Sequence, residues 1–119
     1  MLRINRTGVM FFLWLVASSA SVRAQATESF SITLKNHLFT PAKIEVPANK
    51  KVKLIIDNQD SQAEEFDSFD LNREKVLFPK QKSVIYIGPL APGEYRFFGE
   101  FSPNTAQGVV VVKEVYNAP

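Results

Sequence analysis

The stretch Tyr95–Gly108 reads YRFFGEFSPNTAQG, and it decides the fold of this chain. Tyr95 and Phe97 fall on one face of a predicted strand, because successive side chains of a strand alternate between its two faces. Ser102–Asn104 predicts a turn. Val109–Lys113 then opens with four consecutive valines, which suit a buried strand. Two strands joined by a short irregular loop form a rim on which a functional site can lie.

Working outward from this stretch, the chain predicts one short strand after another. Hydrophobic and polar residues alternate over Phe30–Leu34, and Val52–Ile56 shows a similar pattern. Further strands are expected at Ile44–Val46, Val76–Phe78 and Val84–Ile87, and a turn or bulge at 36–41. The polar segment Asp57–Arg73 is expected to cross one end of the fold. About seven strands with frequent turn signals predict a single all-β domain, a Greek-key β-sandwich.

The N-terminal residues 1–26 predict a secretory signal peptide. Arg3 and Arg6 precede the short apolar run Val9–Ala17, and small residues allow cleavage after Ala24 or Ala26. The run is shorter than the roughly 20 residues that an ordinary membrane span needs; an uncleaved anchor is the alternative. We therefore expect a folded domain over 27–119, exported to the periplasm, with no membrane span after cleavage.

Charge and cysteine content exclude several classes of function. Lys plus Arg falls from 14 to 11 when Arg3, Arg6 and Arg23 leave with the signal peptide, while 12 acidic residues stay, so the net charge becomes about −1. A near-neutral domain without a basic stripe argues against nucleic-acid binding. The chain has no Cys and one His, which excludes thiolate catalysis, iron–sulfur clusters and sites built from several imidazoles.

The spacing of four separate segments resembles the cupredoxin domain, over about Phe30–Glu114. The shared motifs are F-x-P-x-x-I-x-V-P, an I-x-N-x-D strand end, P-G-x-Y-x-F and G-x-V-x-V. Their residues here are Phe39, Pro41, Ile44, Val46 and Pro47; Ile56, Asn58 and Asp60; Pro92, Gly93, Tyr95 and Phe97; and Gly108, Val110 and Val112. The resemblance implies a cupredoxin-like β-sandwich.

The copper ligands of blue-copper cupredoxins, His, Cys, His and Met, are absent from the matching positions. The resemblance places the first His at Glu64, or at Glu65, and the others at Gly99, Ser102 and Ala106. A type 1 copper site needs the thiolate and the imidazoles. The resemblance therefore implies the fold without its best-known cofactor.

A narrower resemblance concerns Cys-free cupredoxin-like domains of EfeO-type periplasmic iron-uptake proteins and of Ftr-type ferrous-iron permease systems. It is carried by AEEFDS (63–68), LNREKV (71–76) and FFGEFSPNTAQG (97–108). This group implies metal ligands at Glu65, Asp67 and Glu100, and as partners an iron permease with other periplasmic iron-uptake components. Ser102 departs from the pattern, because related domains often carry His there.

The chemistry of the acidic residues agrees with such a site. Carboxylates are hard oxygen donors, which favour Fe(II), Fe(III), Mn(II) or Ca(II) over Cu(I), and an imidazole would add affinity for Cu(II). Glu65 and Asp67 at i and i+2 of a strand would point to the same face. Second choices for a ligand are Glu64, His37 and Asp70. The alternatives stay open: solvated surface acids, a Glu64 that points to water, and a His37 that only stabilises its turn.

These observations predict an accessory protein that binds an iron or copper ion through carboxylates and supports ferrous-iron transport. The alternative is a metal-free module that docks onto an envelope protein through Phe69, Phe98, Phe101 and the acidic segment. No enzyme motif is present, since GxSxG and phosphate loops are absent and a Ser-His-Asp set could form only around His37. Ferroxidase-like activity is the one enzymatic possibility, and it would need an electron acceptor from a partner.

Overall fold

The computed structural model describes residues 13–21 and 26–115, and within them it contains nine strands and no helix. The strands are β1 (Ser29–Lys35), β2 (Leu38–Thr40), β3 (Lys43–Pro47), β4 (Val52–Asn58), β5 (Glu64–Ser68), β6 (Arg73–Leu77), β7 (Gln81–Ile87), β8 (Gly93–Gly99) and β9 (Gln107–Lys113). The predicted all-β sandwich is thus confirmed.

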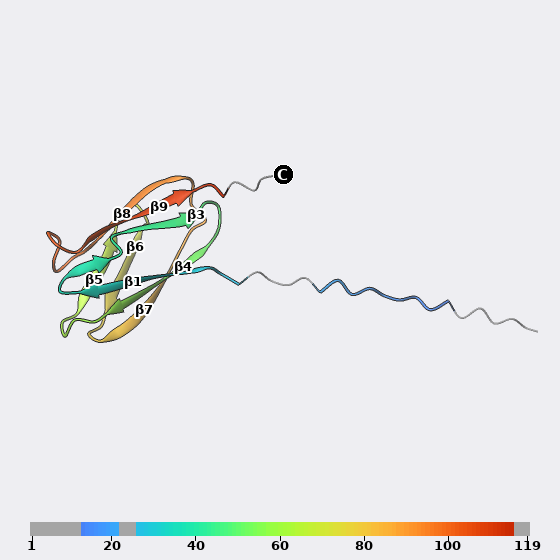
Figure 1. The fold of residues 1–119 in the computed structure, drawn as a ribbon, viewed down its shortest axis with the longest axis horizontal. Coiled ribbons are helices and arrows are strands. Elements are labelled where there is room, and N and C mark those ends of the chain that lie inside the picture. The colour runs from blue at the N-terminus through green and yellow to red at the C-terminus, as the bar shows by residue number, and fades with distance from the viewer. Residues whose placement is uncertain (1–12, 22–25, 116–119) are drawn as a thin grey trace, which may run out of the picture.

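The strands form two mixed sheets that pack as the two layers of a sandwich (Figure 1). One sheet has the order β2-β1-β4-β7, and the other has the order β3-β9-β8-β5-β6. The pairs β1–β4 and β3–β9 are parallel, and the remaining pairs are antiparallel. Parallel neighbours cannot be joined by a tight hairpin, so the chain passes repeatedly from one sheet to the other.

The core lies between the sheets and is built from the inward-facing residue of each alternating pair. Three phenylalanines from different segments meet at its centre: the rings of Phe66 and Phe97 stack at 5.0 Å, and Phe39 packs edge-on at 5.2 Å from Phe97. Offset and edge-on aromatic pairs at these distances are favourable beyond the area that they bury. These three rings hold β5 and β8 together at Phe66, which lies between Glu65 and Asp67 in the sequence.

The polar segment Asp57–Arg73 differs from the prediction. It does not simply cross one end of the fold, because Glu64–Ser68 forms β5, which pairs with β6 on one side and β8 on the other. The alternation of hydrophobic and polar residues typical of a strand is obscured in β5, because two of its inward-facing residues, Glu64 and Ser68, are polar. The expected turn at 36–41 likewise contains the short strand β2.

The predicted signal peptide lies mostly outside the described residues. Residues 13–21 contain the end of its apolar run and the small residues that follow; they form neither helix nor strand and are exposed. Among the residues that the structure describes, no helix is long and apolar enough to cross a membrane. The cleavage positions after Ala24 and Ala26 stay predictions.

Candidate functional site

Three carboxylates converge on the outer face of the five-stranded sheet. Glu65 and Asp67 point outward from β5, as the two-residue period of a strand requires. The β5–β6 hairpin places Glu74 directly opposite Asp67. One carboxylate oxygen from each of these residues lies within 4.8 Å of the others. We call Glu65, Asp67 and Glu74 the acidic cluster.

Sequence reasoning found two of the three residues and missed Glu74. Glu74 stands between Arg73 and Lys75, which makes it look like part of a solvated charged run. Had Glu64–Ser68 been identified as a strand, the turn after it would have paired Ser68 with Arg73 and Asp67 with Glu74. Glu74 was missed because the pairing of β5 with β6 was not predicted.

The predicted ligand Glu100 lies beside this cluster. It follows the end of β8, and its backbone N–H donates to the carbonyl of Glu65 at 2.9 Å. The pKa of its exposed carboxyl is raised above the ordinary 4.5 by partial loss of water and by Asp67, with Glu65 and Glu74 adding repulsion. Glu100 thus lies beside Glu65 and Asp67 but is not one of the three residues whose carboxylate oxygens meet within 4.8 Å, and a metal at these residues stays a prediction.

The acidic cluster has no cation of its own among the described residues. In that part of the chain, ion pairs within 4.0 Å join only His37 to Asp60 and Lys113 to Glu45. The guanidinium of Arg73, next in sequence to Glu74, is directed to the carbonyls of Tyr86, Asn72 and Leu71. Like charges on opposite strand positions repel, so the site would be stabilised by a bound cation.

The cluster borders a surface depression and two aromatic rings. The depression has a volume of about 350 Å³, and Asp67 and Glu74 form part of its wall. Phe69 also lines it and lies 5.8 Å from Phe98, measured between ring centroids. Phe69 is 81% exposed.

The second-choice residues do not join the cluster. The Asp70 carboxylate accepts the N–H of Arg96 at 2.8 Å, so it satisfies a backbone donor of β8. His37 lies in the turn between β1 and β2, where its ring Nδ1 is 3.2 Å from the Ser102 hydroxyl. The structure places both as local hydrogen-bonding residues.

Ser102, His37 and Asp60 meet on the rim but do not form a catalytic triad. The imidazole contacts Ser102 Oγ at 3.2 Å and Asp60 Oδ2 at 3.9 Å through the same atom, Nδ1. A triad needs the serine and the carboxylate on different ring nitrogens. This geometry does not support serine hydrolase chemistry.

Asp60 has a structural task instead, because Asn36 and His37 adopt left-handed backbone conformations with φ of 52° and 58°. The Asp60 carboxylate accepts their N–H groups at 2.7 and 3.0 Å. Partial burial would raise the pKa of Asp60, but the donors His37 and Asn36 outweigh it and hold the pKa below its ordinary 3.8. The carboxylate thus stabilises the β1–β2 turn.

Glu64 does not point to water, and that alternative is wrong. It is 2% exposed and faces the space between the sheets. Its Oε1 accepts the N–H of Phe101 at 2.7 Å and the N–H of Glu65 at 2.9 Å. A buried carboxylate persists when such donors replace its water.

The four positions that resemble copper-ligand positions do adjoin one another. A Cβ added to Gly99 would lie 2.6 Å from Glu64 Cδ and 2.8 Å from Ala106 Cβ, while the N–H of Ser102 donates to the carbonyl of Gly99 at 3.2 Å. The residues themselves do not fit type 1 copper, since they offer no thiolate and no imidazole. The Glu64 carboxylate takes the space beside Gly99.

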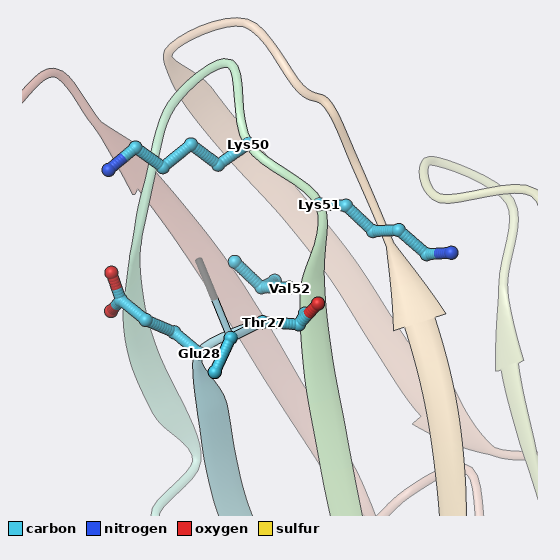
Figure 2. Close-up of a pocket in the computed structure, with 6 residues that line it drawn as sticks. Thr27, Glu28, Lys50, Lys51 and Val52 are labelled. Atoms are coloured by element: carbon cyan, nitrogen blue, oxygen red, sulfur yellow. The ribbon is translucent and has the colours of Figure 1, made fainter. Parts of the chain in front are cut away.

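A second pocket lies near the start of β1 and has a volume of about 290 Å³. Lys50 and Lys51 line it, but Figure 2 shows their side chains pointing in opposite directions from the backbone. The Lys51 ammonium lies 4.7 Å from the centre of the Tyr86 ring. The two charges therefore do not converge on one anion.

Comparison with known proteins places the fold. A family model described as "Cupredoxin-like domain" matches residues 8–112. The chain is 47% identical over 83 residues to the uncharacterized protein RP394 of Rickettsia prowazekii (strain Madrid E), a match that covers 70% of this chain and 66% of that protein.

Several solved structures share the architecture. A copper-binding protein in its apo form has a TM-score of 0.65 at 18% identity, covering 76% of this chain and 93% of its own. Reduced auracyanin from Roseiflexus castenholzii has a TM-score of 0.60 at 16% identity, covering 75% and 99%. The purple cupredoxin of Nitrosopumilus maritimus has a TM-score of 0.55 at 20% identity, covering 70% and 98%. At these identities the likeness concerns the fold.

Proposed function

This chain belongs to the cupredoxin-like domain family, and we propose that within the family it binds one hard metal cation at the acidic cluster. The observation that carries the proposal is the convergence of three carboxylate oxygens within 4.8 Å of one another, with no basic side chain paired to them in the described chain. Glu100 at the edge supplies a fourth carboxylate.

The donor set favours iron over copper. The cluster offers only oxygen ligands, which suit Fe(II), Fe(III), Mn(II) and Ca(II), whereas Cu(I) prefers thiolate or thioether and Cu(II) gains from imidazole. The single imidazole, His37, is not among the residues that converge there. The donor set ranks copper below the hard cations, and the resemblance to domains of iron-uptake systems leads us to propose an iron ion as the physiological ligand.

We further propose that the protein acts in the periplasm as an accessory component of ferrous-iron transport. The signal-peptide pattern of residues 1–26 supports export. The resemblance to Cys-free domains of iron-uptake systems supports an iron permease as the partner. In this scheme the acidic cluster captures iron from solution and presents it to the permease, and any oxidation of the iron requires an acceptor on that partner.

The proposal is tested by titrating the chain Thr27–Pro119, which contains every described strand, with Fe(II), Fe(III), Mn(II), Cu(II) and Zn(II) in a calorimeter. We expect iron to bind with a dissociation constant of about 1 μM or lower, equivalent to about 8 kcal/mol. The triple variant Glu65→Gln/Asp67→Asn/Glu74→Gln removes the charges with little change of shape and is expected to lose this binding.

The matched control removes three exposed carboxylates outside the cluster, through Glu28→Gln/Glu94→Gln/Glu114→Gln. It has the same change of net charge and should bind iron as the natural chain does. Affinity no better than millimolar for every metal, or equal losses in the two triple variants, would refute the acidic cluster as a metal site.

A metal-free docking module is the second candidate, and the exposed aromatic rings favour it. Phe69 is 81% exposed and Phe101 is 59% exposed. If the rim docks onto an envelope protein, Phe69→Ser/Phe101→Ser should abolish co-purification with the iron permease. The control variant Glu28→Gln/Glu94→Gln/Glu114→Gln, which lies outside that surface, should leave it unchanged. Retention of the permease by the phenylalanine variant would dismiss this candidate.

A further inference from the structure

The buried Glu64 is the one candidate ligand that faces the interior and has no place in the acidic cluster. Its Oε1 accepts two backbone N–H groups, one from Glu65 on its own strand and one from Phe101, which lies 37 residues away. The second hydrogen bond, at 2.7 Å, joins β5 to the loop that follows β8.

This hydrogen bond connects β5 to the chain beyond the last backbone pair of β5 and β8. The register between β5 and β8 reaches Phe66 opposite Gly99 and ends there. Past Gly99, the Glu100 N–H donates to the Glu65 carbonyl at 2.9 Å, and the Phe101 N–H donates to the Glu64 side chain. Glu100 is therefore tied to β5 on both sides of its own Cα.

The Glu64 carboxylate packs directly against the Cα of Gly99. A Cβ at this position would lie 2.6 Å from Glu64 Cδ and 2.8 Å from its Oε2, which is closer than unbonded carbon and oxygen atoms approach. The absence of a side chain at Gly99 leaves the room that the carboxylate uses. The two positions form one packing unit at the base of the loop.

We infer that Glu64 is a positioning residue, which holds the loop of residues 100–106 on β5 and thereby keeps Glu100 beside the acidic cluster. The inference rests on the proposed function for its metal part. The hold on the loop is independent of any metal. Because Glu64 faces the opposite side of β5 from Glu65, it acts on the metal through the loop rather than by direct coordination.

The loop part is tested by hydrogen exchange of the Phe101 amide in metal-free protein. Glu64→Ala removes the acceptor and should make this amide exchange faster, whereas Glu64→Gln keeps an acceptor oxygen and should preserve its protection. Gly99→Ala crowds the carboxylate and should also speed exchange, which supplies a second variant if Glu64→Ala does not fold. Unchanged exchange of Phe101 in Glu64→Ala would overturn the inference.

The pairing of Glu64 with Gly99 is tested by a double-mutant cycle on the melting temperature. Gly99→Ala should lower the melting temperature more in the natural chain than in Glu64→Ala, where only the contact with Ala106 remains. Additive effects of the two substitutions would show that the carboxylate does not occupy this space.

The metal part is tested by calorimetric titration with Fe(II). We expect Glu64→Ala to weaken binding about tenfold, Glu64→Gln to restore it, and the exposed Glu94→Ala on β8 to leave it unchanged. If Glu64→Ala binds Fe(II) as tightly as the natural chain does while its Phe101 amide exchanges faster, the positioning role is overturned and the proposed function is left intact. Absence of iron binding by the natural chain would instead overturn the proposed function, while Phe101 exchange would still decide the hold on the loop.

Discussion

Glu64 and Glu65 are neighbours of the same residue type, yet the two faces of β5 give them opposite environments. Glu64 is 2% exposed and accepts two backbone N–H groups. Glu65 lies on the outer face, where Asp67 and Glu74 are its neighbours. The inner carboxylate has two backbone donors, whereas the outer one has like charges beside it. A cation bound on the outer face would relieve this repulsion.

The difference shows how a strand can separate a structural task from the proposed binding task within five residues. Inward-facing Phe66 and Ser68 continue the task of Glu64, since they pack and satisfy backbone groups. Outward-facing residues carry charge at some cost to stability and so point to a ligand. The following experiments separate the two faces.

The largest expected effect is on the inner face, at Phe66. This ring is fully buried and stacks on Phe97 at 5.0 Å, so Phe66→Ala should lower the free energy of unfolding by about 3–5 kcal/mol. Urea unfolding followed by fluorescence measures the change. Phe69→Ala, which truncates an 81% exposed ring, is the control and should stay within about 0.5 kcal/mol. Equal losses would mean that the assigned faces are wrong.

On the outer face, a saturating metal should stabilise the protein. If iron binds only the folded state, iron at 100 times its dissociation constant adds about 2.7 kcal/mol to the free energy of unfolding. Thermal or chemical unfolding with and without iron measures this shift. The variant Glu65→Gln/Asp67→Asn/Glu74→Gln should show no shift, and a full shift in that variant would place the metal elsewhere.

A smaller effect is expected at Ser68 on the inner face. Its hydroxyl donates to the Arg96 carbonyl at 2.6 Å and accepts the Leu71 N–H at 3.0 Å, so it joins β5, β8 and the β5–β6 turn. Ser68→Ala leaves the buried Leu71 N–H and the part-buried Arg96 carbonyl without that partner and should cost about 1–3 kcal/mol in unfolding free energy. The exposed Ser61→Ala serves as the control. No difference between them would remove this link from the fold.

The smallest effect is electrostatic and belongs to Glu100. Because its folded pKa is raised above 4.5, its contribution to stability is fully present below pH 4.5 and is lost as the pH rises through the folded pKa. Glu100→Gln should therefore raise the melting temperature of the metal-free protein slightly at pH 7 and not at pH 4. A lower melting temperature at pH 7 would show that the charge of Glu100 is favourable.

Much of the fold could be predicted from local patterns. The alternation in β1 and β4, the turn before β8 and the valines of β9 each indicate a strand or turn from a few residues. β5 was missed because Glu64 and Ser68 are polar and inward-facing, and no local rule puts a carboxylate in a core. Its burial depends on the Phe101 N–H, which is distant in the sequence.

By itself, the sequence determined the all-β class, the absence of a thiolate and the acidic character of 64–74, because composition and periodicity are properties of short segments. The tertiary structure decided which acids meet. The hairpin register places Glu74 opposite Asp67, and Glu100, just after β8, lies near these two carboxylates. Glu64 is on the opposite, buried face of β5. Convergence of charges depends on pairing between strands, which the pattern of any one strand by itself does not specify.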